Sequence, residues 1–256
     1  MNIKVISQKN GIAKFILQDS TVSFVNTVRR LILDEVMTMA IDTVEIRKND
    51  SALYDEMLAS RLGLIPLTTD LASYKLRSQC ACEGEGCLSC EVKLTLKKTG
   101  PCNVYASDLQ TSDPKIKPAY DKILIVKLFD GQEIDIAATA TLGKGKEHAK
   151  HSAGYLTYKY LPKVTAKKDT DLDKLQKEIS VDIISNGKID NEKVILANLD
   201  SIFPLFEEGT LKLDESDTDF VITVESYGQL SPKEILSQAA NELLLKMNTF
   251  SKQLDL

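Results

Sequence analysis

The 256-residue sequence contains no tryptophan and only two histidines. A hydrolase built on a Ser–His or Cys–His pair would have to use His148 or His151, and both lie in one Gly- and Lys-rich segment, 143–154. No apolar run approaches the roughly 18–20 residues of a membrane span. The N-terminus, MNIKVISQKNG, lacks the continuous apolar core of a signal peptide. We therefore expect no contact with a membrane and a cytoplasmic location, or a nuclear one in a eukaryote.

The sequence also lacks an excess of positive charge. Lys and Arg number 32 against 37 Asp and Glu, which gives a net charge of -5. Proteins that grip a phosphate backbone usually have the opposite bias, so direct specific DNA binding is disfavoured, although a local basic patch is compatible with these numbers. The 43% hydrophobic and 27% charged residues are ordinary for a globular protein and exclude collagen-like and wholly disordered chains.

Cysteine is scarce but concentrated in one place. Four of the five cysteines fall within CACEGEGCLSC, with the spacing C-x-C-x4-C-x2-C: Cys80, Cys82, Cys87 and Cys90. In a reducing compartment, clustered thiols indicate metal ligands rather than disulfides. Four thiolates satisfy a tetrahedral structural zinc, and no open position remains for catalysis. An iron–sulfur cluster and unmetallated thiols remain alternatives, and Cys102 is most simply a small core residue.

Hydrophobic periodicity predicts a chain of short strands and few helices. Strands are predicted at 3–7, 12–17, 41–49, 91–98, 122–129, 133–142, 155–162 and 219–226. Helices are predicted at 21–37 and 231–254, and a short helical segment within 55–67 that Gly63 closes before Ile65-Pro66. A Lys-Asn-Gly turn joins the first two strands, and Asp130-Gly131-Gln132 joins 122–129 to 133–142. Residues 163–174 are polar and indicate a linker, followed by a small αβ section that has an Asn186-Gly187 turn and ends with the segment 210–216.

The C-terminal helix has the clearest signals. Ser231 is a predicted N-cap, Pro232 takes the first helical position, and Glu234 completes a capping box. One apolar stripe consists of Leu236, Ala239, Leu243, Met247 and Phe250, and a second flank of Ile235, Leu244 and Leu245. Because apolar residues cover more than one side, this helix either packs within its own chain or presents a flank to a partner.

No catalytic constellation is visible. The sequence has no Gly-rich phosphate loop before a helix and no nucleophile elbow. His148 and His151 could together ligate a metal, but a loop that also holds Lys144, Lys146 and Lys150 is more typical of a polar contact surface.

Four stretches, in the same order, resemble the alpha-like assembly subunits of multisubunit RNA polymerases, most closely the archaeal D-type subunits. They are FVNTVRRLILDEV (24–36) with MAIDTVEIRKN (39–49), DEMLASRLGLIPL (55–67), FDGQEIDIAATATLGKGKEHAKHSAG (129–154) and VESYGQLSPKEILSQAANEL (224–243). The resemblance spans nearly the whole chain. It implies an α+β fold with a discontinuous alpha-type dimerisation domain made of 1–49 and 216–256. Residues 50–164 are then an inserted mainly-β domain that carries the four-cysteine loop, and residues 165–215 a small ferredoxin-like domain.

The resemblance also implies a function. The chain would be a non-catalytic scaffold of DNA-directed RNA polymerase, with no catalytic residues of its own, that forms a heterodimer with subunit L. The dimer would then recruit the small subunits N and P and the large catalytic subunits. The residues that match subunit-contact positions are Asn26, Arg29, Arg30, Asp55, Glu56, Arg61, Lys146, His148, Leu236, Leu243, Met247 and Phe250.

Relatives in this family carry a zinc loop in the inserted domain, which agrees with a structural zinc here, although the interval between the second and third cysteines differs. Many archaeal members hold iron–sulfur clusters in the ferredoxin-like domain. No cysteine follows Cys102, so we expect no iron–sulfur cluster in residues 165–215.

Two other functions compete with the scaffold. A zinc-knuckle protein could bind nucleic acid through the lysines of 144–151, and it would do so in a salt-sensitive manner. A hydrolase could use His148 or His151. The acidic net charge argues against the first.

Overall fold

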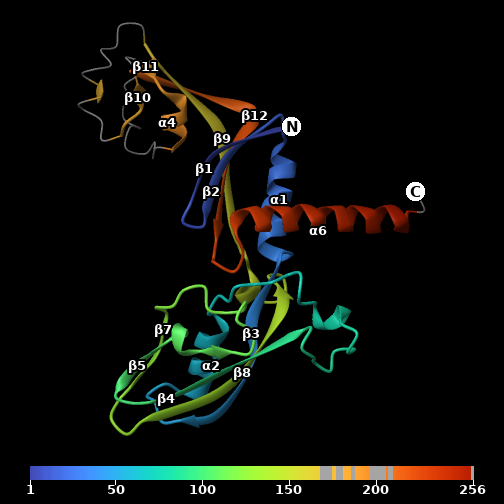
Figure 1. Cartoon of the computed structure of the whole chain (residues 1–256). Coiled ribbons are helices and arrows are strands. Elements are labelled where there is room, and N and C mark those ends of the chain that lie inside the picture. The colour runs from blue at the N-terminus through green and yellow to red at the C-terminus, as the bar shows by residue number, and fades with distance from the viewer. Residues whose placement is uncertain (168–174, 177–180, 186–187, 197–205, 207–209, 255–256) are drawn as a thin grey trace. The chain divides into compact units, whose positions relative to one another are not determined.

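The computed structural model describes residues 1–167, 175–176, 181–185, 188–196, 206 and 210–254 (Figure 1). They form mixed α and β structure in which every strand pairing with a defined register is antiparallel. The chain divides into two compact units. The first unit is Met1–Asn26 with Thr157–Val224, and the second is Thr27–Leu156 with Glu225–Leu256. The expected three-domain division stays a prediction, because contact density does not by itself identify a part that folds alone.

The first unit is built on a four-stranded sheet of order β1-β2-β12-β9. Its strands are β1 Asn2–Lys9, β2 Ile12–Gln18, β9 Gly154–Ala166 and β12 Leu211–Ser226, the last two continuing into the second unit. The predicted N-terminal hairpin is confirmed. Its turn places Asn10 at φ 50° and Gly11 at φ 77°, the left-handed conformations that these residue types tolerate.

Two predictions on the strands of this unit were wrong. The polar segment 163–174 is not a linker from its start, because β9 continues through Ala166 and buries Val164. The segments 210–216 and 219–226 are not separate elements, since β12 runs through both. Pairing with neighbouring strands extends a strand through residues whose local pattern is polar.

The rest of the first unit contains β10 Ile184–Ser185, β11 Lys188–Ile189 and α4 Asn191–Leu196. Val164, Ile183, Val194 and Leu211 are buried together in one apolar cluster. The predicted Asn186-Gly187 turn lies outside the described residues. The ferredoxin-like assignment of this section stays a prediction.

Helix α1, Val22–Asp34, confirms the predicted first helix. The Thr21 hydroxyl accepts the Phe24 amide at 3.3 Å and caps its start. Val25 and Ile32, on the predicted apolar face, are 1% and 0% exposed.

In the second unit, a four-stranded sheet of order β3-β8-β4-β6 carries the core. The strands are β3 Met37–Asn49, β8 Glu133–Lys144, β4 Glu91–Thr99 and β6 Gln110–Thr111, and a separate pair is formed by β5 Cys102–Tyr105 and β7 Leu124–Leu128. Helix α2, Asp55–Gly63, buries Leu58 and Leu62 in the core that contains Leu94 of β4. Three short 3-10 helices complete the unit: η1 Arg77–Gln79, η2 Ala106–Asp108 and η3 Ala149–His151.

The predicted strands 122–129 and 133–142 are both present, as β7 and β8, but they do not pair with each other. Strand β8 pairs with β3 along one edge and with β4 along the other, so neither edge is free for β7, which pairs with β5. The turn between them is nevertheless formed. The Phe129 amide donates to Gln132 Oε1 at 2.7 Å, and Gly131 has φ 73°.

Helix α6, Pro232–Gln253, confirms the predicted last helix and its capping box at Ser231 and Glu234. Ile235 and Ala239 are fully buried, whereas the large apolar side chains beyond Leu243 are exposed. None of the described helices combines the length and apolar character needed to cross a membrane.

Candidate metal centre and subunit-contact surfaces

The cysteine loop is a tight turn between η1 and β4. Its backbone turns back on itself through left-handed residues, Glu83 at φ 52°, Gly84 at φ 91° and Gly86 at φ 97°. The positive φ of Gly86 favours glycine there, and a Cβ would in addition lie 2.3 Å from the Glu91 carboxylate and force that side chain to move. Arg77 forms an ion pair with Glu91, which ties η1 to the first residue of β4 at the base of the loop.

The four thiols converge on one point. The Sγ atoms of Cys80 and Cys87 lie 3.5 Å apart, those of Cys82 and Cys90 3.6 Å, and those of Cys87 and Cys90 3.8 Å. Tetrahedral zinc with Zn–S bonds of about 2.3 Å requires Sγ–Sγ separations of about 3.8 Å. A disulfide would require about 2.05 Å. The cluster therefore has the dimensions of a four-coordinate metal site, and the four residues could hold a metal ion.

The environment of the thiols differs across the cluster. Hydrogen bonds from the backbone of Gly86 and Gly84 lower the pKa of Cys82 to about 6. Burial raises the pKa of Cys90 to about 12, and its side chain is fully buried. A bound cation would deprotonate both, because a coordinating thiol loses its proton outright. The arrangement thus fits a site that is complete only when it holds an ion.

Loop 144–152 is held by the end of α1. The Lys146 amide donates to the Asp34 carbonyl at 2.9 Å, and the Ser152 hydroxyl donates to the Leu33 carbonyl at 3.2 Å. These carbonyls are among those that a helix C-terminus leaves without intrahelical partners. A Cβ on Gly145 would lie 1.9 Å from the Leu33 carbonyl oxygen, so only glycine permits this approach.

The two histidines have different roles. His151 is 4% exposed, and its Nδ1 lies 2.9 Å from the Thr38 carbonyl, which makes it a donor in the neutral ring. Burial lowers the pKa of His151. His148 is exposed and accepts the Lys150 amide at 3.0 Å. Among the described residues, the two do not join a metal-binding cluster.

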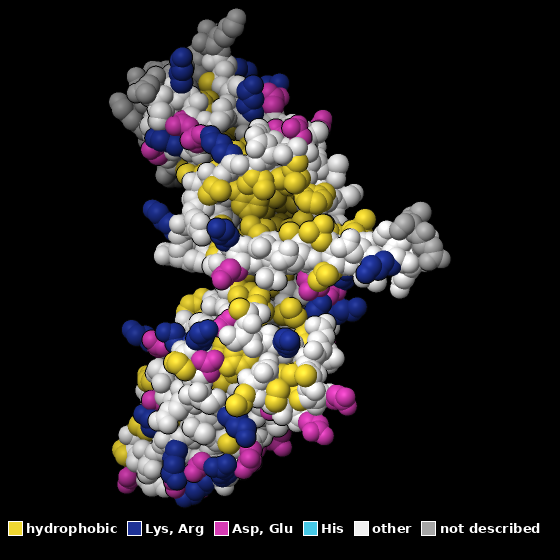
Figure 2. Space-filling model, turned by 45° about the vertical axis from the view of Figure 1, so that its right-hand side comes forward, with side chains coloured by type: hydrophobic (Ala, Val, Ile, Leu, Met, Phe, Trp, Pro, Cys, Tyr) yellow, Lys and Arg dark blue, Asp and Glu magenta, His cyan; other side chains and the backbone are white. Residues whose placement is uncertain are grey.

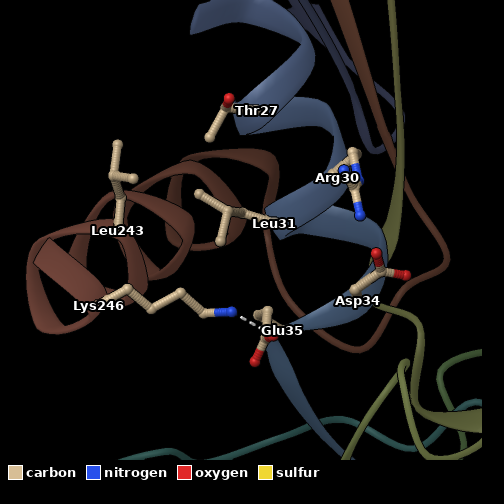
Figure 3. Close-up of a pocket in the computed structure, with 7 residues that line it drawn as sticks. All are labelled: Thr27, Arg30, Leu31, Asp34, Glu35, Leu243 and Lys246. Atoms are coloured by element: carbon tan, nitrogen blue, oxygen red, sulfur yellow. Dashed lines mark hydrogen bonds and ion pairs between the residues drawn. The ribbon is translucent and has the colours of Figure 1, made fainter. Parts of the chain in front are cut away.

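Four charged side chains connect this loop to α1 and α6. Lys144 Nζ lies 3.0 Å from Glu35 and 2.9 Å from Glu242, and Lys246 Nζ lies 2.5 Å from Glu35. We call this set the Glu35 network. Beside it is a pocket of about 250 Å³ between α1 and α6 (Figure 3). Figure 3 shows Leu31 pointing from α1 toward α6, where Leu243 lies across the pocket.

Burial would raise the pKa of Glu35, but hydrogen bonds from Lys246 and Lys144 outweigh it, so this pKa lies below its ordinary value. Burial likewise opposes the charge on Lys144, and hydrogen bonds to Glu242 and Glu35 raise its pKa nonetheless. Glu35 and Lys144 therefore both keep their charges at neutral pH.

The predicted contact residues occur in four segments of the chain. Arg30, Asp55, Glu56, Arg61, Lys146, His148, Met247 and Phe250 are exposed, whereas Asn26, Arg29, Leu236 and Leu243 are half-buried. They lie on α1, on α2, in loop 144–152 and on α6. The exposed side chains among them are accessible to other chains.

Sequence reasoning missed exposed apolar side chains on α2 and at its two ends. Met57 of α2 is 52% exposed, and the capping residues Tyr54 and Leu64 are 76% and 61% exposed, whereas Leu58 and Leu62 are buried. Their spacing of 3 and 7 residues was a readable helical signal. Hydrophobic side chains at the surface of the second unit are visible in Figure 2. Leu88, 90% exposed at the tip of the cysteine loop, had no such signal.

Comparisons with known proteins all find subunits of RNA polymerase. The family model described as the RNA polymerase Rpb3/RpoA insert domain matches residues 44–159. The DNA-directed RNA polymerase subunit Rpo3 of Thermococcus kodakarensis is 38% identical over 260 residues, 99% of this chain and 98% of that protein. The protein of the same name from Methanosarcina acetivorans is 38% identical over 94% of this chain and 93% of its own. The subunit of the same name from Methanosphaera stadtmanae is 35% identical over 95% of this chain and 94% of its own.

Proposed function

Because the chain belongs to the family of the DNA-directed RNA polymerase subunit Rpo3, we propose that it is a non-catalytic assembly subunit of an archaeal DNA-directed RNA polymerase. The observation that carries the proposal is similarity over almost the full length of both chains. The archaeal D-type subunit expected from the sequence is, we infer, the same kind of subunit. Nucleotide transfer belongs to other chains of the enzyme.

The first partner is subunit L, in a heterodimer formed through α6. The second half of this helix exposes Leu244, Leu245, Met247 and Phe250 at 57–61%. Large apolar side chains that gather on one exposed element are typical of protein–protein contact surfaces. This supports the partner-facing alternative for the C-terminal helix.

The small subunits N and P and the large subunits contact the remaining surfaces. Met57 of α2 and the capping residues Tyr54 and Leu64, with the charged Asp55, Glu56 and Arg61 nearby in the chain, offer apolar contacts bordered by charge. Arg30, Lys146 and His148 offer exposed polar groups on α1 and loop 144–152. An apolar centre with a polar rim is the usual composition of such interfaces.

The metal of the cysteine loop is zinc, in a structural role. Four sulfur ligands at tetrahedral separations leave no coordination position for water or substrate. We expect the zinc to fix the loop and, with it, the position of the exposed Leu88. No iron–sulfur cluster is expected in the chain.

The competing functions lose support from side-chain pairing. Of the lysines that would bind nucleic acid, Lys144 is paired with two carboxylates, and Lys150 is paired with Asp42 at 2.7 Å. These contacts neutralise much of the basic loop. For a hydrolase, the burial of His151 against the Thr38 carbonyl leaves no access for a substrate.

Co-expression with subunit L of the same polymerase tests the proposal. The wild-type chain is expected to co-purify with L in equal amounts, and Met247→Glu is expected to abolish this, because it places a charge in the apolar contact. Ser237→Glu, at an exposed polar position in the first half of the same helix and about 15 Å along its axis from Met247, is the matched control and should bind normally. A monomeric wild-type chain that ignores L would disprove the assembly function.

A further inference from the structure

Glu35 carries a negative charge where local electrostatics opposes one. It follows directly on Asp34, the last residue of α1, and its amide still bonds to the Leu31 carbonyl at 2.9 Å. The C-terminus of a helix is the negative end of its dipole, and the last turn of α1 contains no basic residue. The Glu35 side chain is also only 11% exposed. Burial of a carboxylate at this end of a helix requires compensation from elsewhere.

The compensation comes from α6 and β8. Lys246 and Lys144 each donate to a different oxygen of the Glu35 carboxylate. Lys144 also donates to Glu242, so two carboxylates face two ammonium groups. Two carboxylates and two ammonium groups thus form a closed, neutral set. Three of the four side chains are at most 21% exposed, so solvent screens these contacts less than it screens a surface pair.

The network lies where α6 stops being held by apolar packing. Ile235, Ala239, Glu242 and Lys246 follow one another by 4, 3 and 4 residues on one helix face. The first two are fully buried, and the last two are the ion-pair partners. At this level the space between α1 and α6 is the 250 Å³ pocket, where apolar contact is incomplete (Figure 3). Beyond Lys246, residues 247–253 continue the helix for about 10 Å.

We propose that Glu35 is a positioning residue for the exposed half of α6. Through Lys246 and Lys144 it fixes the direction in which this half extends, so that the apolar side chains are pre-organised for a partner. Ion pairs can fix the direction of a helix because they require a specific geometry. Partial apolar contact requires no specific geometry. A helix held in its bound direction loses less entropy on association. The proposal rests on the proposed function, since it takes subunit L as the partner of α6.

Two measurements on the full-length chain test this role. Hydrogen exchange of the backbone amides of 243–253 reports the fixing of the helix in the free chain, and titration with subunit L reports affinity. Glu35→Gln removes the carboxylate charge that both lysines contact, with little change of side-chain size, and Lys246→Gln removes only the contact between Lys246 and Glu35. Lys246 is 52% exposed, so its replacement leaves the fold intact. Glu45→Gln removes an equal charge from an exposed pair with Arg47 on β3 and is the matched control.

Both variants are expected to accelerate exchange in 243–253 and to weaken binding to L by roughly five- to tenfold. The double variant is expected to bind no more weakly than Glu35→Gln alone, because Glu35→Gln has already broken the ion pair with Lys246. Glu45→Gln should match the wild type. Unchanged exchange in Lys246→Gln, unchanged affinity, or additive effects in the double variant would each overturn the positioning role. If the wild-type chain does not bind L at all, the proposed function fails instead, while the exchange result still decides whether the network fixes the helix.

Discussion

Two loops of the second unit are held in place in opposite ways. In the cysteine loop, 80–90, only Cys90 is fully buried, and the backbone hydrogen bonds within the turn span three or four residues, such as Glu83 to Cys80. Loop 144–152 instead buries His151 and Ser152 and bonds to the end of α1. The cysteine loop has four metal-ligating side chains but little apolar burial. Loop 144–152 has hydrogen-bond partners far away in sequence and needs no metal ion.

This difference in burial and bonding indicates which interactions stabilise each loop. A loop without apolar burial gains its fixed shape from metal coordination, because four bonds replace a missing core. A loop that caps a helix end depends on close backbone approach and on the charge state of its buried groups. A substitution or a change of pH that destabilises one loop should therefore leave the other loop unchanged.

The largest effect is expected from loss of a metal ligand. Cys87→Ser leaves three thiolates, and structural zinc binding in small sites is worth on the order of 10 kcal/mol. The purified variant should lose its metal, and residues 80–90 should become sensitive to limited proteolysis, while loop 144–152 stays protected. Metal analysis by mass spectrometry measures the first, and peptide mapping measures the second.

Cys102→Ser is the matched control for that experiment. Cys102 lies on β5, half-buried, and its Sγ contacts the Thr99 carbonyl rather than the cluster. This variant should keep its metal in full. Metal loss from Cys102→Ser, or retention in Cys87→Ser, would contradict the assignment of the four ligands.

A smaller effect is expected from Gly145→Ala. The added Cβ would meet the Leu33 carbonyl at 1.9 Å, so the loop must move away from α1 and give up hydrogen bonds. We expect a loss of about 2–3 kcal/mol in the free energy of unfolding, measured by urea denaturation, with the metal retained. Gly63→Ala, where the nearest atom lies at an ordinary 3.6 Å, should stay within about 0.5 kcal/mol of the wild type.

The smallest effect concerns pH. Burial lowers the pKa of His151 in the folded chain, so the unfolded chain takes up a proton at higher pH than the folded one. Stability should therefore be complete above about pH 6.5 and fall as the pH drops, by at most about 1.4 kcal/mol per unit, until folded His151 is protonated as well. His151→Gln should remove this slope between about pH 5 and 6.5, measured by denaturation at each pH.

His148→Gln should keep the slope, because His148 is exposed. The carboxylates act in a separate window. The pKa values of Glu35 and Asp42 lie below their ordinary 4.5 and 3.8, so their contributions are lost only as the pH falls below these values. A slope that persists in His151→Gln above about pH 5 would show that another group is responsible.

Much of the local structure was predictable because it depends on neighbours in sequence. The Asn10-Gly11 turn, the capping box at Ser231 and Glu234 and the convergence of four closely spaced cysteines all follow from short-range geometry. The failures were long-range. Sequence alternation at 122–129 and 133–142 could not reveal that both edges of β8 are taken by β3 and β4.

The sequence by itself determined the family, the cysteine site and the starts of the main helices, because motif order, ligand spacing and N-terminal capping depend on adjacent residues. Only the tertiary structure decided what the scarce and the charged residues do. It buried His151 and left His148 outside, and it paired Lys144 and Lys150 with carboxylates far away in sequence. The reason is physical. Burial and ion pairing depend on which segments far apart in the sequence come into contact, and a local sequence pattern does not predict those contacts.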